Sequence, residues 1–246
     1  MNLLIHSDAR FAARTVAGVI ANAASDEPDL VLGLPTGRTP IPVYEELAKL
    51  SARGDLDLSR ARSFNLDELL LPRNQPASFR SFMNRHAWTQ IGLDPGRCDI
   101  PDGEADPCRE CARYDTAVAA AGGLDLVFLG VGADGHVAYN LPGPPEARTH
   151  CVELPANLAE SLEVPAPWRP RRAIPMGRGT LLSARRRVIL ALGGVKAQAV
   201  RALLEGPETQ EWPCSLLRGH AMLEVALDVA AAGGEWPTES HIMRRG

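Results

Sequence analysis

A histidine that follows a carboxylate and a glycine is the clearest chemical feature of the sequence. Asp134, Gly135 and His136 come directly after an apolar run at residues 124–130. An imidazole exchanges a proton near neutral pH, and Asp134 is close enough along the chain to orient it. Glycine also lets the backbone turn tightly beneath a ligand. The segment predicts an acid–base centre, and a solvent-exposed turn is the alternative interpretation.

Two threonines around a glycine form a second cluster after another apolar run. Thr36, Gly37, Arg38 and Thr39 follow residues 30–34 and precede a helical pattern. Backbone N–H groups, two hydroxyls and the positive end of a helix dipole together suit a phosphate group. The same residues would also suit a plain strand–helix turn in which the threonines cap the helix.

A pair of adjacent carboxylates forms the third cluster. Asp67 and Glu68 end the apolar run at residues 62–66. Burying two carboxylates at the end of an apolar strand costs free energy unless water solvates them or they take part in binding or catalysis. One of them could be a general base, and an ordinary helix cap is the alternative.

Strands that alternate with helices must position these clusters. Strands are expected at residues 3–6, 30–34, 62–66, 124–130, 187–192 and 223–228, and helices at 9–24, 40–50, 78–88, 106–121 and 196–204. This alternation predicts one α/β domain over residues 1–246, with a mostly parallel sheet covered on both faces. Ligands gather at the carboxyl ends of such strands, where all three clusters fall. Residues 142–175 fit no regular pattern and are interpreted as a lid, a surface excursion or a long loop.

The charge and the cysteines of the chain limit its function. The net charge is −4 with only short basic runs, which argues against nucleic acid as a partner. No apolar run is long enough to predict a membrane span, and the first residues do not resemble a signal peptide. Five cysteines, an odd number, favour reduced thiols in the cytoplasm. Cys108 and Cys111 are expected on a helix, without a metal or redox role.

Seven segments, in order along the chain, resemble the glucosamine-6-phosphate deaminase and 6-phosphogluconolactonase superfamily. They are residues 32–40, 64–68, 78–83, 124–136, 177–182, 193–197 and 213–217. The resemblance implies a Rossmann-like three-layer α/β fold and a small phosphorylated sugar as the substrate. It implies no metal and no organic cofactor. Because the family includes hexamers, a homo-oligomer is among the expectations.

The resemblance also assigns roles to residues. It implies that Asp67 is the base that moves a proton between C1 and C2 of the opened sugar. His136, supported by Asp134, would open the ring. The arginine that deaminases place in an Asn-rich stretch is absent around residues 157–162, and Arg172 or Arg178 is the expected substitute. The implied substrate- and phosphate-binding residues are Thr36, Gly37, Arg38, Thr39, Gly135, Arg172 and Lys196.

The two branches of the superfamily are separated by few positions. Leu69 after the carboxylate pair favours a deaminase, whereas Leu141 replaces the glutamate that deaminases carry there and is followed by the Pro142-Gly143 of lactonases. Because Leu141 carries no charge, we expect His136 to be neutral more often at pH 7 than its deaminase counterpart. The sequence therefore favours amino-sugar-phosphate isomerisation with deamination. Lactone hydrolysis and sugar-phosphate binding without turnover are the alternatives.

Overall fold

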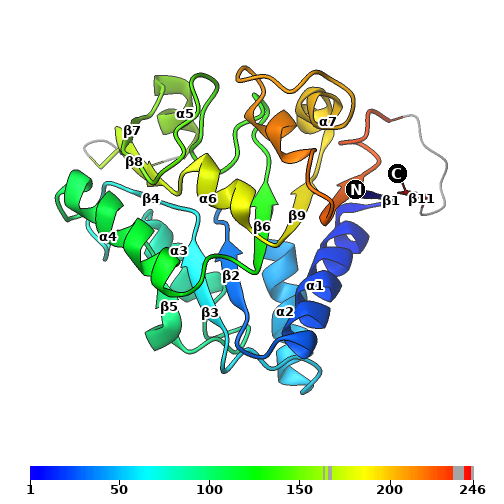
Figure 1. Cartoon of the computed structure of the whole chain (residues 1–246), viewed down its shortest axis with the longest axis horizontal. Coiled ribbons are helices and arrows are strands. Elements are labelled where there is room, and N and C mark those ends of the chain that lie inside the picture. Colours follow the sequence, from blue (N-terminus) through cyan, green and yellow to red (C-terminus); the bar gives the residue numbers. More distant parts are fainter. Residues whose placement is uncertain (163, 166–167, 235–240, 245–246) are drawn as a thin grey trace.

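A sheet of eight strands forms the centre of the molecule in the computed structural model, which describes residues 1–162, 164–165, 168–234 and 241–244 (Figure 1). Seven of its strands are parallel, and β11 runs antiparallel at one edge. The expected mostly parallel sheet is therefore confirmed. In spatial order the strands are β11 (His241–Arg244), β1 (Asn2–His6), β10 (Leu223–Asp228), β9 (Arg186–Ala191), β6 (Leu126–Gly130), β2 (Val31–Leu34), β3 (Arg62–Asn65) and β5 (Cys98–Asp99).

Helices cover both faces of this sheet and complete the three layers (Figure 1). The apolar side chains of α1 (Ala9–Asp26), α2 (Ile41–Ala52) and α3 (Phe79–His86) pack against one face. Those of α4 (Pro107–Ala120), α6 (Arg178–Ser183) and α7 (Ala197–Leu204) pack against the other. Successive strand residues point to opposite faces, so strands covered on both sides are apolar throughout, as in β6.

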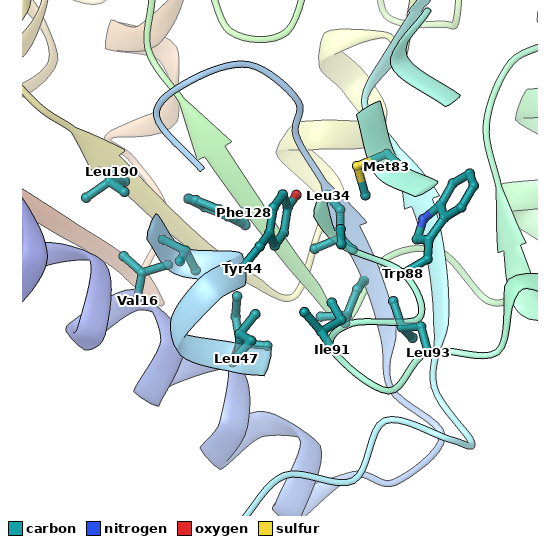
Figure 2. Close-up of a cluster of buried hydrophobic side chains, with 14 of the residues drawn as sticks. Val16, Leu34, Tyr44, Leu47, Met83, Trp88, Ile91, Leu93, Phe128 and Leu190 are labelled. Carbon is teal, nitrogen blue, oxygen red and sulfur yellow. The ribbon is translucent and has the colours of Figure 1, made fainter. Parts of the chain in front are cut away.

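The core beneath α2 fixes the turn that follows β2 (Figure 2). Tyr44 and Leu47 of α2 lie against Leu34 and Phe128, and the Tyr44 ring meets Phe128 edge-on at 6.4 Å between centroids. The Tyr44 hydroxyl donates a hydrogen bond of 2.5 Å to the carbonyl of Pro35. A buried hydroxyl needs such a partner, so the same contact that satisfies Tyr44 holds the chain just before the threonine cluster.

Helix ends follow the capping residues in the sequence. The Asp8 carboxylate accepts N–H groups from Arg10 and Phe11 at the start of α1, and the Ser78 hydroxyl accepts the Ser81 N–H at the start of α3. These caps satisfy donors that the first helical turn leaves unpaired. The strands and helices predicted from the sequence are all present, with ends shifted by a few residues.

A second, three-stranded antiparallel sheet was not predicted. It consists of β4 (Asp67–Leu69), β8 (Arg172–Pro175) and β7 (Val152–Glu153), with α5 (Ala156–Ser161) between β7 and β8. Residues 142–175 therefore contain two short strands and a short helix, which the interpretation as a lid, a surface excursion or a long loop did not include. Residues 163, 166 and 167 lie outside the described part of that stretch. The strand expected at residues 223–228 is also not the last one, because β11 follows β10.

Candidate active site

A cavity of about 210 Å³ lies where the carboxyl ends of β2 and β6 meet the start of β4. This is the edge of a parallel sheet where ligands collect. The three polar clusters expected from the sequence converge here, each from a different strand end. The polar and glycine residues that face the cavity beside Tyr139 are Thr36, Gly37, Arg38, Thr39, Asp67, Gly130, Gly132, His136 and Lys196.

The turn after β2 forms one wall of the cavity. Gly37 has a φ of +97°, a conformation that favours glycine, and the turn leads directly into α2. Arg38 of this turn and Lys196, which ends a short 3₁₀ helix before α7, both face the cavity. Burial lowers the pKa of Lys196, and the nearby Asp134 carboxylate opposes that effect. The wall thus presents two cations and two hydroxyls beside a helix N-terminus, a setting that suits an anion.

Asp67 is the carboxylate on the cavity wall, and it is only 6% exposed. Burial and, to a smaller extent, the adjacent Glu68 carboxylate raise its pKa to about 8, and the backbone N–H of Tyr139 opposes this rise. Asp67 stands at the first position of β4, just after the chain leaves β3. A carboxyl group with a pKa near the operating pH is suited to take and return a proton.

Glu68 has a different task from its neighbour. Its carboxylate accepts backbone N–H groups from Leu69 at 2.8 Å, from Phe79 at 2.7 Å and from Arg80 at 2.9 Å. It is 2% exposed, and burial raises its pKa to about 7. Of the two interpretations of this carboxylate pair, the helix cap therefore describes Glu68, whereas Asp67 faces the cavity.

The loop after β6 holds His136 against Asp134. The imidazole Nδ1 lies 2.7 Å from the Asp134 carboxylate, which also accepts the His136 backbone N–H at 3.2 Å. The hydrogen bond from the His136 side chain is the main reason that the pKa of Asp134 falls to about 2. Asp134 is thus ionised over the whole neutral range and orients the ring, while His136 rather than Asp134 faces the cavity.

Two glycines make this loop possible. A Cβ on Gly132 would overlap the His136 ring, so only glycine leaves room for the imidazole there. Gly135 has a φ of +83°, and a Cβ on it would lie 2.7 Å from the Trp212 ring. The Gly135 carbonyl also accepts the Cys214 N–H at 2.9 Å. Gly135 therefore shapes the loop from behind, and its predicted role in substrate binding stays a prediction.

Neither arginine proposed as a substitute phosphate ligand faces the cavity. Arg172 is exposed in β8, where its guanidinium lies 3.9 Å from Glu153. Arg178 is buried and donates hydrogen bonds to the carbonyls of Gly143 and Pro144. The direction of β8 determines the position of Arg172, and the surrounding carbonyl groups determine that of Arg178. The spacing of residues in the sequence reveals neither determinant.

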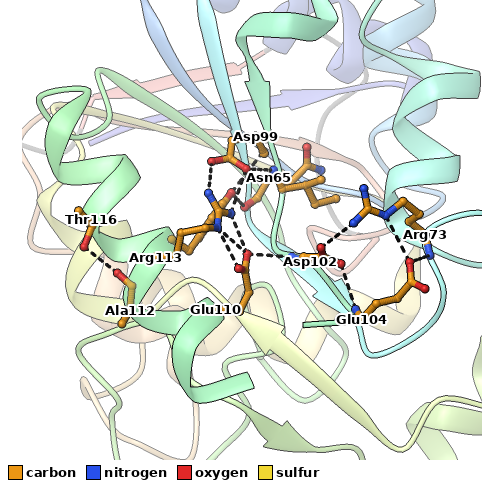
Figure 3. A network of polar contacts seen from close by, with 11 residues as sticks. Asn65, Arg73, Asp99, Asp102, Glu104, Glu110, Ala112, Arg113 and Thr116 are labelled. Atoms are coloured by element: carbon orange, nitrogen blue, oxygen red, sulfur yellow. Dashed lines mark hydrogen bonds and ion pairs between the residues drawn. The ribbon is translucent and has the colours of Figure 1, made fainter. Parts of the chain in front are cut away.

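A polar network ties α4 to the connection between β4 and α3 (Figure 3). Arg113 of α4 binds Asp99 at 2.8 Å and Glu110 at 2.7 Å, and Glu110 accepts the backbone N–H of Asp102. The Asp102 carboxylate then binds Arg73 at 2.6 Å. Because Arg73 lies between β4 and α3, the network restrains the segment that follows Asp67 and Glu68.

Several cavity residues were missed by reasoning from the sequence. Tyr139 and Phe79 supply aromatic walls, and Leu158 and Leu162 supply aliphatic ones from α5 and its end. The position of Tyr139, three residues after His136, could have indicated that it lies near the cavity. Leu158 gave none, because α5 was not predicted.

Among the described residues, no three His, Cys, Asp or Glu side chains are grouped so that they could hold a metal ion. Within the described ranges no helix is long and apolar enough to cross a membrane. Cys108 and Cys111 both lie in α4, as expected, and are free thiols.

The fold and the site together define a Rossmann-like α/β protein whose sheet edge places Asp67 and His136 beside a cationic wall that carries Arg38 and Lys196. The chain belongs to the family described as glucosamine-6-phosphate isomerases/6-phosphogluconolactonase, whose model matches residues 7–225. The resemblance inferred from seven short segments is thereby confirmed, and it extends over most of the chain.

Two relatives at about 40% identity are named as glucosamine-6-phosphate deaminases. A glucosamine-6-phosphate deaminase of Bacillus velezensis is 40% identical over 225 residues, which cover 89% of this chain and 93% of that protein. One from Pseudarthrobacter chlorophenolicus is 41% identical over 243 residues, with 94% and 92% covered. A solved monomeric glucosamine-6-phosphate deaminase superposes with a TM-score of 0.90 at 34% identity, covering 96% of this chain and all of the other. The 6-phosphogluconolactonase of Trypanosoma brucei shares the fold, with a TM-score of 0.76 at 19% identity.

Proposed function

We propose that this protein is a glucosamine-6-phosphate deaminase, which converts an amino-aldose phosphate into the ketose phosphate and ammonia. The named relatives at about 40% identity over nearly the whole chain support this function. The observation that carries it is the composition of one cavity, where Asp67 and His136 face the same space as Arg38 and Lys196. Proton-transfer groups and phosphate-binding cations in one small space suit a sugar phosphate.

The sugar phosphate is anchored at the wall made by the turn after β2. Lys196 and Arg38 neutralise the phosphate charge, and the hydroxyls of Thr36 and Thr39 donate hydrogen bonds to its oxygens. Arg38 takes the place of the arginine that is missing around residues 157–162, because Arg172 and Arg178 do not face the cavity.

The reaction begins with opening of the sugar ring. His136 moves the proton of the C1 hydroxyl to the ring oxygen, the bond from C1 to that oxygen breaks, and C1 becomes an aldehyde. Asp134 holds the imidazole in one orientation during this transfer, because its carboxylate stays ionised at 2.7 Å from Nδ1. Holding both groups in place removes the entropic cost of bringing them together.

Asp67 then carries out the isomerisation. Its carboxylate takes the proton from C2 while the substrate's ammonium group passes a proton to O1, which leaves a neutral enolamine. The carboxyl group then returns its proton to C1, which leaves a protonated imine at C2. Water adds to this imine and ammonia departs, so the product is the 2-keto sugar phosphate. The base must be ionised before it can act, and the pKa of Asp67 is about 8. The value of kcat/KM should therefore rise as the pH increases from 6 to above 8.

Lactone hydrolysis is the second candidate. It is favoured by Leu141, Pro142 and Gly143, which resemble the lactonase pattern. In that reaction His136 would take a proton from water, which would then attack the lactone carbonyl. The cationic wall would bind the phosphate in the same way, so the two functions differ in the chemistry and not in the anchor.

The test measures both activities on the same preparation. We expect ammonia release from glucosamine 6-phosphate and little acid release from 6-phosphogluconolactone. His136→Ala should abolish the first activity, whereas His150→Ala, a histidine outside the cavity, should retain it. Hydrolysis of the lactone alone would establish the second candidate. Tight binding of glucosamine 6-phosphate without turnover would instead identify a sugar-phosphate-binding protein and overturn the proposal.

A further inference from the structure

Three rings form a column that crosses the cavity wall from α3 to the loop after β6. The rings of Phe79 and Tyr139 stack with centroids 5.9 Å apart and planes inclined by 8°. Tyr139 in turn stacks on the His136 imidazole, with centroids 6.2 Å apart and an angle of 24°. Tyr139 is therefore the middle ring, and it is only 6% exposed.

The first end of the column is tied to the strand that carries Asp67. Phe79 is the first residue of α3, and its backbone N–H donates to the Glu68 carboxylate at 2.7 Å. Glu68 follows Asp67 directly in β4. The position of the Phe79 ring is thus linked to the position of Asp67 through one buried carboxylate.

The backbone around the middle ring is equally constrained. Ala138 has a φ of +50°, a conformation that alanine adopts only when neighbouring contacts enforce it. The side-chain amide of Asn140 donates to the carbonyls of Val137 at 3.1 Å and Met176 at 2.9 Å, and Val137 and Asn140 form an isolated bridge. Tyr139 therefore cannot shift independently of this short turn.

Tyr139 also contacts the base directly. Its backbone N–H donates to the Asp67 carboxylate while its ring lies on His136. Tyr139 thus touches both groups that the proposed reaction uses for proton transfer. Asp67 comes from β4 of the small sheet, and His136 comes from the loop after β6 of the large sheet.

Resting on the function proposed above, we infer that Tyr139 is a positioning residue that fixes Asp67 and His136 relative to one another. The hydroxyl is not required for this task, because the stacking faces and the backbone N–H make the contacts. A ring is required, since an aliphatic side chain of similar volume offers no flat face to the imidazole, which can then rotate about its hydrogen bond to Asp134. A displacement of about 1 Å between reacting groups costs on the order of 100-fold in rate.

The experiment compares Tyr139→Phe and Tyr139→Leu with a matched control. Tyr114 of α4 is a second buried tyrosine whose ring lies 5.9 Å from that of a phenylalanine, Phe64, but it does not line the cavity. Tyr114→Leu therefore removes a comparable ring that lies outside the column, together with the 2.6 Å hydrogen bond from its hydroxyl to the Asn65 carbonyl.

We expect Tyr139→Phe to keep kcat within about threefold of the natural protein. Tyr139→Leu should lower kcat about 10- to 100-fold with KM changed less than about threefold. Its rising pH limb should also move to lower pH, because water gains access to Asp67. Tyr114→Leu should lower the melting temperature without changing kcat or that limb.

Two results would overturn the inference. One is a Tyr139→Leu variant with unchanged kcat and pH profile, and the other is a Tyr139→Phe variant that loses as much activity as the leucine variant. Turnover by the natural protein is measured first. Its absence would refute the proposed deaminase function, whereas its presence with insensitive Tyr139 variants would refute only the positioning role.

Discussion

Replacing Asp67 with asparagine should stabilise the protein at high pH while abolishing turnover. Burial raises the pKa of Asp67 to about 8, far above its ordinary value of 3.8. Between these two values the folded protein binds more protons than the unfolded chain, so the stability of the natural protein falls as the pH rises. Asparagine stays neutral at every pH and avoids this loss.

The size of the effect follows from the two pKa values. A tenfold change in proton affinity corresponds to about 1.4 kcal/mol, which gives an upper bound of about 6 kcal/mol above pH 8. Water in the cavity solvates part of the charge, so we expect about 2–3 kcal/mol. In a chain of this length that corresponds to an increase of about 4–12 °C in melting temperature.

Thermal unfolding of both proteins from pH 5 to pH 9 provides the assay. The difference in melting temperature should be small at pH 5 and should grow steadily to a plateau above pH 8. Asp55→Asn is the control, because this exposed carboxylate lies 2.9 Å from Arg53 and far from the cavity. An Asp67→Asn variant that melts at or below the natural protein at pH 9 would refute the assignment of a destabilised, buried carboxylate.

Three further substitutions test the surroundings of the two proton-transfer groups. Glu68→Gln removes a charge that raises the pKa of Asp67, so the rising limb of kcat/KM should move to lower pH, and the lost cap should cost about 1–2 kcal/mol in chemical denaturation. Leu141→Glu should favour the charged imidazole and raise kcat at pH 7, and an unchanged or lower kcat would contradict the role given to this position. Gly132→Ala should push the His136 ring aside and lower kcat about 100-fold or more, while inhibition by the product ketose phosphate stays within about threefold.

The layered fold could be predicted because its signals are local. Residues 124–130 contain almost no polar side chain, which indicates a strand buried on both faces, and β6 is such a strand. The small sheet gave no comparable signal. Its strand β8 holds an arginine at one end and a proline at the other, and its partner β4 lies far away in the chain. Short strands that depend on distant partners have no periodicity of their own.

The candidate site was predicted where backbone position alone decides which residues meet. Strand ends bring Asp67 and His136 to one edge, and the structure places both on the cavity. Long side chains were less predictable, as Arg172 shows, because strand pairing decides which way the guanidinium points. Tyr139 was missed because its place depends on a left-handed Ala138, a conformation that composition does not reveal.

The chain passes from β3 of the large sheet into β4 of the small sheet. Phosphate binding and the position of the proposed base, two properties that enzymes must usually adjust together, therefore depend on different sheets. The proposed phosphate-binding turn and Lys196 follow strands β2 and β9 of the large sheet, whereas Asp67 belongs to the small sheet, whose other two strands, β8 and β7, come from residues 152–175. We therefore expect substitutions in β7 or β8 to shift the Asp67 carboxylate by fractions of an ångström while the proposed phosphate-binding residues keep their positions. In such an architecture the catalysed reaction can change during evolution, while the affinity for phosphorylated compounds is retained.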